Sequence, residues 1–482
     1  MNDDAIAYYS KLVDELGEGI EKGFFSKDYI PEKYKWKHLM ALFYLSDILD
    51  GGKEMFSTIY SLIIKSSEKR IRKKARTGEK IKVSFQSYSA AQWPAESIYR
   101  TFEKDERFEV GVIVSPLCER DEISRKDAYS QCTSYFRENN YRVYEGMKEN
   151  GTYPGFDELG GIPDILFLTS SWFSALPQSQ WFIELPLNTL TGYIPYGLYM
   201  MDNVDGSYAS SIVYNKEMIN LMWRVYCDCS LNLDGYRKHQ LLEGKNVRLS
   251  GYCKMDYFYE NRKWSDEDVA KIWKIPEGKD PKSVKKVIVA PHYSVCDKGP
   301  VLLSTFQKNL WFFLYLAEKY RDEVSFVLKP HPNLRLKAVN VGLFKSYEEY
   351  DEYIKRWENL PNAKVIQDAG YLELFDTSDA MIMDSGSFLG EYLYTGKPLL
   401  YLTRPEQAFL PTGKKVVETY YKTPGENYFE IEKFLDDVVI KGNDYMKEER
   451  SAVFKEEYDY KSINGTLASE YICNDVYELM NA

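Results

Sequence analysis

The chain has 482 residues, 44% of them hydrophobic and 28% charged, which is typical of a folded protein with more than one domain and excludes a disordered chain. Its net charge of −11 argues against a general nucleic-acid-binding protein, and seven cysteines without a CxxC pair beside only four histidines argue against a zinc site. The acidic N-terminus argues against a secretory signal, and no apolar run approaches the ~20 residues of a membrane span. These features predict a cytoplasmic protein.

Residues 1–78 are predicted to form a helical extension, because apolar residues such as Tyr9, Leu12 and Leu16 recur at helical spacing. The extension ends in the basic run KSSEKRIRKKARTGEK. Two interpretations of this run stay open. It is either a solvated helix face and linker, which we favour, or an electrostatic tether that gives peripheral contact with the inner face of the cell membrane.

From residue 79 the pattern changes to short apolar strands that alternate with helices, and this predicts a first domain over residues 79–262. We expect strands at 81–85, 110–114, 141–143, 164–168, 192–195 and 246–249. Such alternation is typical of a parallel, doubly wound sheet, which binds its ligand beyond the carboxyl ends of the strands. That rule places Gln92, Trp93 and Tyr196 on one rim, as candidate residues for binding an acceptor.

A polar segment with Pro276 and Pro281 contains the predicted boundary to a second domain, residues 263–482. A second alternating series follows. We expect strands that end at Ala290, at Leu328 and near Gln367, then strands at 380–383 and 399–402, with a long helix at 302–320. The tail after Glu418 is expected to be mostly helical. Both domains are therefore predicted to be α/β, doubly wound and Rossmann-like.

The stretch around residues 380–402 carries the strongest local pattern. A buried strand at 380–383 is followed by the turn Asp384-Ser385-Gly386-Ser387, and helical spacing begins at residue 388. A strand, a small-residue turn and a helix N-terminus together present backbone N–H groups to an anion. Ser385 and Ser387 add hydroxyl donors, and Gly386 lets the backbone approach closely. The alternative is that Asp384 and Ser385 only cap the helix.

Two further strand ends carry side chains that bind anions. His292 follows the strand ending at Ala290, and Lys329 and His331 follow the strand ending at Leu328. Two imidazoles, an ammonium group, two hydroxyls and a helix N-terminus at one sheet edge would hold a diphosphate without a metal. Glu391 is a candidate partner for ribose hydroxyls, or else it only interacts with the helix dipole.

The blocks APHYSV, KPHP and DSGSFLGEYLYTGKPLLYL resemble the C-terminal half of the CDP-glycerol glycerophosphotransferase family, whose bacterial members build teichoic acids and phosphate-containing capsule or lipopolysaccharide chains. The blocks FQSYSAAQWPAESIYR, IPDILFL, YIPYG and SGYCKMD resemble divergent members from polysaccharide loci. This resemblance implies a glycosyltransferase-B-like (GT-B-like) architecture of two Rossmann-like domains that face a cleft. The second domain would hold a cytidine nucleotide and the first an acceptor.

The resemblance also implies roles for single residues. His331 resembles the family histidine that contacts the donor phosphates, and Ser385 and Ser387 resemble the hydroxyl-bearing phosphate loop. The first domain departs from the family, because better-known members carry a His-Gly pair whose histidine is taken to be the base. The comparable strand end here contains Tyr196 and Gly197. Either another residue takes the proton or His292 does.

The expected activity is transfer of a glycerol- or ribitol-phosphate group from a CDP-activated donor to a hydroxyl of a cell-surface glycan or lipid-linked glycan, with release of CMP. No obligatory metal or other cofactor is expected. One alternative is a GT-B glycosyltransferase for capsule or lipopolysaccharide synthesis that uses a UDP- or CMP-linked sugar. More distant alternatives are ketal pyruvyl transfer and a non-catalytic subunit of a glycan-assembly complex.

Overall fold

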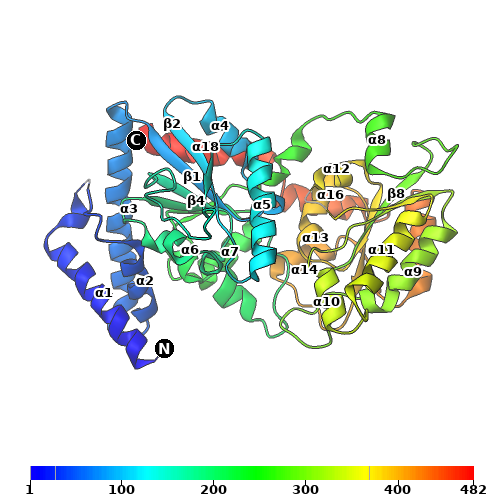
Figure 1. Cartoon of the computed structure of the whole chain (residues 1–482), viewed down its shortest axis with the longest axis horizontal. Coiled ribbons are helices and arrows are strands. Elements are labelled where there is room, and N and C mark those ends of the chain that lie inside the picture. Colours follow the sequence, from blue (N-terminus) through cyan, green and yellow to red (C-terminus); the bar gives the residue numbers. More distant parts are fainter. Residues whose placement is uncertain (1, 28, 368–369, 482) are drawn as a thin grey trace. The chain divides into compact units, whose positions relative to one another are not determined.

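The computed structural model describes residues 2–27, 29–367 and 370–481. The chain forms two compact units, each built around one parallel sheet (Figure 1). Unit 1 comprises Met1–Gly197, Ser210–Lys254 and Tyr460–Ala482, and unit 2 comprises Leu198–Ala209 and Met255–Asp459. The predicted α/β class with two Rossmann-like domains is confirmed. The chain divides differently from the predicted ranges 79–262 and 263–482, because it passes between the units more than once.

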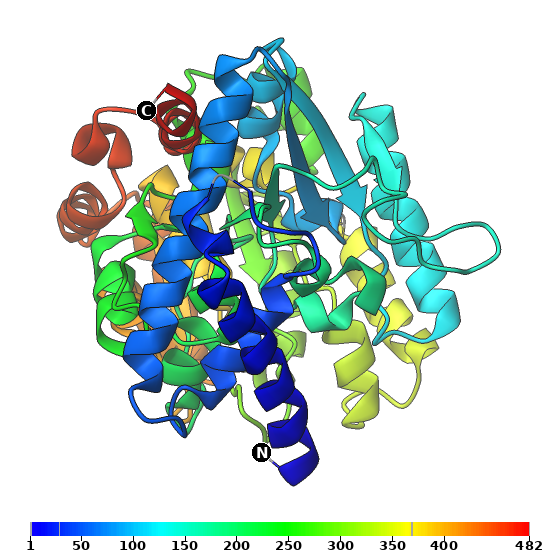
Figure 2. The same cartoon turned by 90° about the vertical axis from the view of Figure 1, so that its left-hand side faces the viewer.

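The N-terminal helices belong to unit 1 and pack beside one another (Figure 2); they are α1 (Asp3–Glu21), α2 (Trp36–Leu45) and α3 (Gly52–Arg76). The Trp36 indole N–H donates to the Thr189 carbonyl at 3.0 Å. The Tyr60 hydroxyl donates to the Met222 carbonyl at 2.7 Å. Through such bonds the predicted extension is part of the same folded unit as the first sheet.

The basic run lies mostly inside α3 and makes ion pairs with its own unit. Arg70 and Lys74 contact the two carboxylate oxygens of buried Asp164 at 2.7 and 2.6 Å. Arg72 pairs with Glu68 one turn earlier, at 3.1 Å. These three cations therefore stabilise the fold of unit 1, and contact of the run with a membrane surface stays a prediction. Within the described residues, no helix has the length and apolar character needed to cross a bilayer.

The sheet of unit 1 has seven parallel strands in the order β3-β2-β1-β4-β5-β6-β7. They are β1 (Ile81–Ser87), β2 (Phe108–Val114), β3 (Val143–Glu145), β4 (Ile165–Leu168), β5 (Leu190–Tyr193), β6 (Arg224–Cys227) and β7 (Val247–Leu249). Its helices include α4 (Glu96–Glu103), α5 (Glu122–Glu138), α6 (Glu217–Leu221) and α7 (Ser230–His239). The order runs outward in both directions from β1 and β4, as in dinucleotide-binding sheets.

The sheet of unit 2 repeats this order with six parallel strands, β10-β9-β8-β11-β12-β13. They are β8 (Lys285–Ala290), β9 (Val324–Leu328), β10 (Ala363–Val365), β11 (Ala380–Met383), β12 (Leu399–Thr403) and β13 (Tyr421–Pro424). The surrounding helices include α8 (Asp266–Ile272), α9 (Phe306–Lys319), α10 (Leu334–Asn340), α11 (Tyr347–Asn359), α12 (Leu372–Thr377), α13 (Ser387–Glu391), α14 (Pro411–Val417), α15 (Tyr428–Lys433) and α16 (Lys447–Glu457).

The core of unit 2 follows from the periodicity of α9. Phe306, Leu310 and Phe313 recur at spacings of four and three, so they lie on one face of the helix. All three are buried in one cluster with strand residues such as Val287 and Phe326. The helix therefore covers one face of the sheet and fixes the loop that leads into it.

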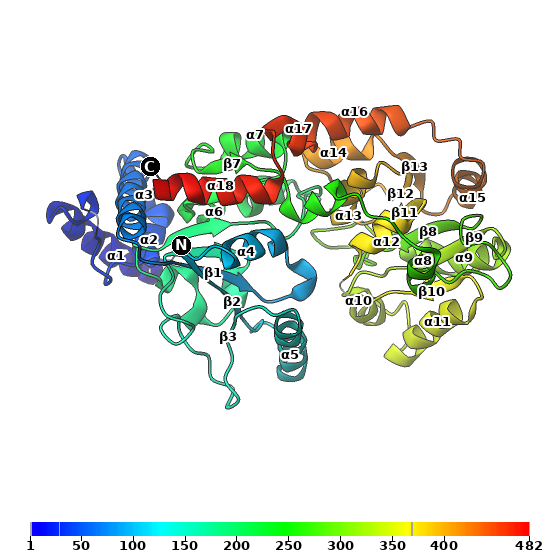
Figure 3. The same ribbon diagram turned by 90° about the horizontal axis from the view of Figure 1, so that it is seen from above.

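The tail after Glu418 is mostly helical, as expected, and it also contains one strand. It begins with β13, which pairs in parallel with β12 as an edge strand. It ends with α17 (Tyr460–Asn464) and α18 (Ala468–Asn481), which belong to unit 1. There α18 lies beside α3 and α4 (Figure 3), and Asp475 pairs with Arg224 at 2.8 Å. Such long-range pairings leave no local mark in the sequence.

Candidate functional site

Three strand-end loops of unit 2 meet where the strand order reverses. β8 and β11 are neighbours there, with Ala290 in register with Met383, and β9 lies on the other side of β8. The loops that follow carry the residues singled out from the sequence: His292 after β8, Lys329 and His331 after β9, and Asp384, Ser385, Gly386 and Ser387 after β11. Open α/β sheets bind ligands outside the carboxyl ends of their strands at this point. The structure thus brings these residues to one edge of one sheet.

Asp384 holds two of these loops together. One carboxylate oxygen accepts the backbone N–H of His292 at 2.6 Å. The other accepts the backbone N–H of Thr305 at 2.6 Å, its hydroxyl at 3.0 Å and the Ser304 hydroxyl at 3.2 Å. Asp384 is 2% exposed, and burial raises its pKa to about 6. The side chain predicted to line the phosphate site is instead an internal anchor that also places a carboxylate at the N-terminus of α9.

The proton of His292 is directed to one ring nitrogen. The Ser294 backbone N–H donates to the His292 Nδ1 at 3.2 Å, and the Ser294 Oγ lies 2.8 Å from the same atom. That hydroxyl accepts backbone N–H bonds from Leu303 and Ser304, at 2.9 and 3.2 Å, so its own proton points to Nδ1. The neutral ring therefore carries its proton on Nε2. Burial, followed by nearby His331, holds the pKa of His292 well below its ordinary value.

His331 is arranged in the same way. The Asn333 backbone N–H donates to the His331 Nδ1 at 3.1 Å, so this neutral ring also carries its proton on Nε2. Burial, followed by the positive charge of Lys329, lowers the pKa of His331 to about 4. The two imidazole rings lie 5.1 Å apart, and the Tyr293 ring contacts both at 4.3 and 4.6 Å. The edge thus carries two neutral Nε2–H donors and one buried ammonium group.

The turn between β11 and α13 presents its two serines differently: Ser385 is half-buried and Ser387 is exposed. Gly386 between them is buried, and a Cβ placed on it would lie 2.5 Å from the Met201 Cγ. The glycine was predicted to allow close approach of an anion. The structure gives another reason for it, because the Met201 side chain occupies the space beside it.

Glu391, the candidate ribose partner, is 2% exposed at the end of α13. Burial, followed by the charge of the Glu391 carboxylate and its hydrogen bond with Tyr371, raises the pKa of the Tyr371 phenol. Both side chains lie inside unit 2. The geometry therefore favours a structural role for Glu391 over contact with ribose hydroxyls.

The carboxyl edge of the unit 1 sheet has a different lining. Trp172, after β4, is 37% exposed and hydrogen-bonds with Tyr196, after β5. The Lys216 ammonium lies 4.1 Å from the centre of the Trp172 ring and donates to the Ser171 carbonyl at 2.6 Å. Burial lowers the pKa of Lys216. An aromatic face, a phenol and an ammonium group therefore stand together where the sequence predicted the acceptor rim.

The structure places the two other predicted rim residues, Gln92 and Trp93, in different surroundings. Gln92 is half-buried and hydrogen-bonds with Tyr88, whose pKa burial raises to about 12. The Tyr88 hydroxyl accepts from Ser170 at 3.3 Å, so Gln92 stays at the rim. Trp93 is 5% exposed and donates its indole N–H to the Tyr141 hydroxyl at 3.0 Å. Trp93 is a core residue and does not line the rim.

Neither histidine of the first half replaces the absent His-Gly histidine. His38 is buried, with its Nε2 3.1 Å from the Glu15 carboxylate. The His239 ring stacks on Tyr214 with centres 5.9 Å apart, and it lies in the last turn of α7. Because α7 starts at the carboxyl end of β6 and runs back to β7, His239 is at the opposite edge of the sheet from the predicted rim.

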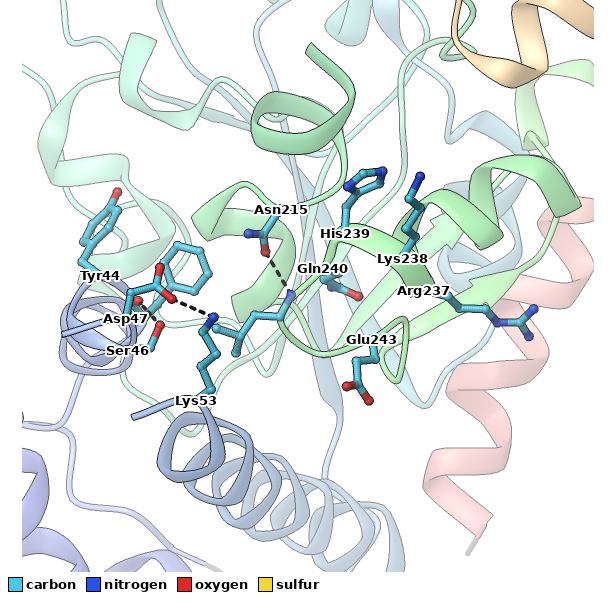
Figure 4. Close-up of a pocket in the computed structure, with 12 residues that line it drawn as sticks. Tyr44, Ser46, Asp47, Lys53, Asn215, Arg237, Lys238, His239, Gln240 and Glu243 are labelled. Carbon is cyan, nitrogen blue, oxygen red and sulfur yellow. Dashed lines mark hydrogen bonds and ion pairs between the residues drawn. The ribbon is translucent and has the colours of Figure 1, made fainter. Parts of the chain in front are cut away.

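That opposite edge contains a polar cavity of about 410 Å³ (Figure 4). It is lined by the turn between α2 and α3 and by the end of α7. Its charged side chains are largely exposed and partly neutralise one another, as in the Lys53–Asp47 pair at 2.8 Å. None of the residues predicted for donor or acceptor binding lines it.

Sequence reasoning missed Ser294, Ser304, Thr305, Met201 and Lys216. Apart from Ser294, each of them acts through a partner far away in the chain. The only local signal was the position of Ser294, two residues after His292. Within the described residues, no group of three or more His, Cys, Asp or Glu side chains could hold a metal ion. The expectation that no metal is required stays a prediction.

No protein-family model and no curated protein matches the sequence. Solved structures do match. The wall teichoic acid polymerase TagF is 13% identical, with a TM-score of 0.52 over 89% of this chain and 97% of its own. The UDP-GlcNAc 2-epimerase of Neisseria meningitidis bound to UDP-GlcNAc is 17% identical, with a TM-score of 0.50 over 83% of this chain and 100% of its own. At these identities the likeness shows the GT-B-like fold of two Rossmann-like units.

Proposed function

We propose that this protein is a cell-envelope transferase that moves a glycerol- or ribitol-phosphate group from a CDP-activated donor to a hydroxyl of a surface glycan or its lipid-linked precursor. The observation that carries the proposal is the edge of unit 2, where His292 and His331 present Nε2–H donors beside Lys329 and the serine-containing turn. Hydrogen-bond donors and one positive charge suit a nucleoside diphosphate. The fold likeness to a wall teichoic acid polymerase supports the same choice.

In this reaction the acceptor oxygen attacks the phosphorus distal to cytidine. The bond between that phosphorus and the bridging oxygen breaks, CMP leaves with both electrons, and the proton of the attacking hydroxyl passes to solvent water or to the departing phosphate. Phosphoryl transfer needs mainly positioning and neutralisation of charge. His331, Lys329, Ser385 and Ser387 supply these to the diphosphate, while His292 donates a second imidazole N–H.

The orientation of His292 favours this role over that of general base. Its Nδ1 already accepts from Ser294, and its Nε2 carries the proton in the neutral ring. Such a ring has no nitrogen ready to take a proton from an incoming hydroxyl. We therefore assign His292 to the donor phosphates.

A glycosyltransferase that uses a UDP- or CMP-linked sugar is the competing function. It is favoured by a specific observation, the fold match with a TM-score of 0.50 to an enzyme bound to UDP-GlcNAc. The same edge would then stabilise a departing nucleotide, and attack would fall on the anomeric carbon. The UDP-linked case differs from polyol-phosphate transfer in the nucleotide that the protein selects, whereas a CMP-linked sugar shares the cytidine but has a single phosphate.

The deciding experiment is a thermal-shift panel of CDP, CMP, UDP, UMP, ADP and GDP, each with and without Mg²⁺. A ligand that binds only the folded protein stabilises it by RT ln(1 + [L]/Kd). Selective stabilisation by CDP supports polyol-phosphate transfer, and selectivity for UDP supports the sugar transferase. The absence of a shift with every nucleotide would favour a non-catalytic glycan-assembly subunit.

The residue-level test is His331→Ala. We expect kcat/KM with the CDP-activated donor to fall about 100-fold, within the range of a positioned group in a phosphoryl-transfer site. His239→Ala is the matched control, because His239 lies in unit 1, at the sheet edge opposite the predicted acceptor rim. The kcat/KM of this variant should stay within twofold of the wild-type value. A loss of less than tenfold for His331→Ala would contradict the assignment of the donor site.

A further inference from the structure

The segment Leu198–Ala209, here named the strap, follows the end of β5 in sequence but is part of unit 2. It lies against three glycines of unit 2. A Cβ on Gly386 would lie 2.5 Å from the Met201 Cγ, and a Cβ on Gly390 would lie 2.1 Å from the Met200 Cε. A Cβ on Gly413 would lie 1.9 Å from the Met200 carbonyl oxygen. The three glycines thus leave room for the strap on α13 and α14.

Backbone bonds hold the strap in this position. The Leu410 N–H donates to the Met200 carbonyl at 3.0 Å, and the Asp202 N–H donates to the Ala408 carbonyl at 3.0 Å. Met201 between them forms an antiparallel bridge with Phe409. The Met201 side chain is therefore fixed at its backbone, and it contacts the turn through its near end, the Cγ atom.

We propose that the strap positions the donor-binding turn, with Met201 as a positioning residue that acts through Gly386. This inference rests on the proposed function, because it names what sets the geometry of the same donor site. Gly386 stands between Ser385 and Ser387, so the contact at Gly386 determines where both serines are held.

Two details make Met201, and not the strap as a whole, the controlling residue. Met200 contacts Gly390 through its terminal methyl group, which moves easily, and Gly390 lies a full helical turn beyond the serines. Gly386 has φ −89° and ψ −64°, a conformation open to any residue. An alanine at 386 is therefore opposed by the contact with Met201 and not by backbone strain.

The test is a double-mutant cycle of Gly386→Ala and Met201→Ala, read by CDP affinity in titration calorimetry and by the melting temperature. We expect G386A to weaken CDP binding at least tenfold. Adding M201A should remove the clash and bring the affinity back to within about threefold of the wild-type value. M201A alone should weaken CDP binding by about threefold to tenfold without a matching fall in melting temperature.

Met200→Ala and Gly390→Ala are the matched controls, since they alter the same strap and the same helix away from the serines. Their CDP affinity should stay within twofold of wild type. M201A creates no clash, so it tests the proposal even where G386A does not fold. The proposal is overturned when M201A binds CDP as wild type does, or when a folded G386A is not rescued by M201A.

Failure of the proposed function gives a different result. If wild-type protein binds no nucleotide at all, the function is wrong whatever the variants do. The same cycle measured in urea unfolding then reports whether Met201 and Gly386 are coupled. Coupling of the two substitutions would support the claim that the strap positions the turn between β11 and α13. Additive effects on stability would reject that claim too.

Discussion

The two sheets share one strand order but carry different chemistry at their carboxyl edges. In unit 2 the edge holds two histidines, a buried lysine and the serine-containing turn, arranged around the carboxylate of Asp384. In unit 1 the corresponding edge holds Trp172, Tyr196 and the Lys216 ammonium group. One set suits a diphosphate and the other a polar ligand with an apolar face.

The difference teaches that strand order places a ligand-binding edge without choosing its ligand. Each unit also has a buried aspartate directly after a strand of this edge, with a pKa that burial raises to about 6. Asp228 in unit 1 accepts from the Asn232 side-chain amide at 2.8 and 3.0 Å. Asp384 in unit 2 instead accepts from both ends of the connection between β8 and α9, at the backbone N–H groups of His292 and Thr305. Only the second aspartate joins loops that carry proposed site residues.

The largest expected effect comes from removing that junction. Asp384→Ala leaves two buried backbone N–H groups and two hydroxyls without their acceptor, and should lower the unfolding free energy by about 4 kcal/mol. Hydrogen exchange should show the His292 and Thr305 amides losing protection. Asp228→Ala should cost about 1–2 kcal/mol, because the partners of Asp228 at Cys227, Cys229 and Asn232 all lie within four residues of it. Equal losses in the two variants would mean that the aspartates have the same role.

The acid dependence of stability should come next in size. The pKa of His331 is lowered from 6.5 to about 4, so the folded protein binds fewer protons than the unfolded chain between these values. The contribution of His331 is complete above pH 6.5 and should fall by about 3 kcal/mol as the pH is lowered to 4. Asp384 titrates in the opposite sense over part of this range, since its pKa is raised.

The measurement therefore compares wild type with His331→Gln in urea unfolding at successive pH values, because the difference between the two curves removes the shared contribution of Asp384. The wild-type curve should be steeper between pH 6.5 and 4. Parallel curves would show that His331 is not held neutral by its surroundings.

The smallest effect is expected at the edge of unit 1. Trp172→Ala removes the exposed aromatic face and the ring beneath Lys216. It should raise the KM for the acceptor about tenfold and leave CDP affinity unchanged, which is the signature of lost acceptor binding. Phe429→Ala is the control, since Phe429 is an exposed aromatic of unit 2, at 72%. A change in CDP affinity with Trp172→Ala would contradict the assignment of donor and acceptor to different sheets.

Much of the fold could be predicted from the sequence, because strand and helix periodicities are local. The strand at residues 380–383 was predicted with the bounds that β11 has, and the loops with His292 and His331 were placed at strand ends. Residue types at strand ends also point to an anion site. What periodicity could not give is the partner of each side chain.

Asp384 shows why the partners of the site residues could not be predicted from the sequence. Its acceptor bonds go to residues 79 and 92 positions away, so its pattern in the sequence resembles that of any helix cap. Gly386 faces Met201 across an even longer separation. Glu391 and Trp93 were assigned to ligand sites by their positions, and burial alone distinguishes them from rim residues such as Tyr196.

The division of the chain also bears on how the protein folds. Unit 2 is formed almost entirely by one continuous stretch, Met255–Asp459, whereas unit 1 combines segments synthesised before and after it. The ion pair between Arg224 and Asp475 closes a loop that contains all of that stretch. Contacts of such sequence separation form slowly. Unit 2 can therefore fold during synthesis before α18 has been made. Until then the faces of α3 and α4 that α18 covers stay exposed to chaperones.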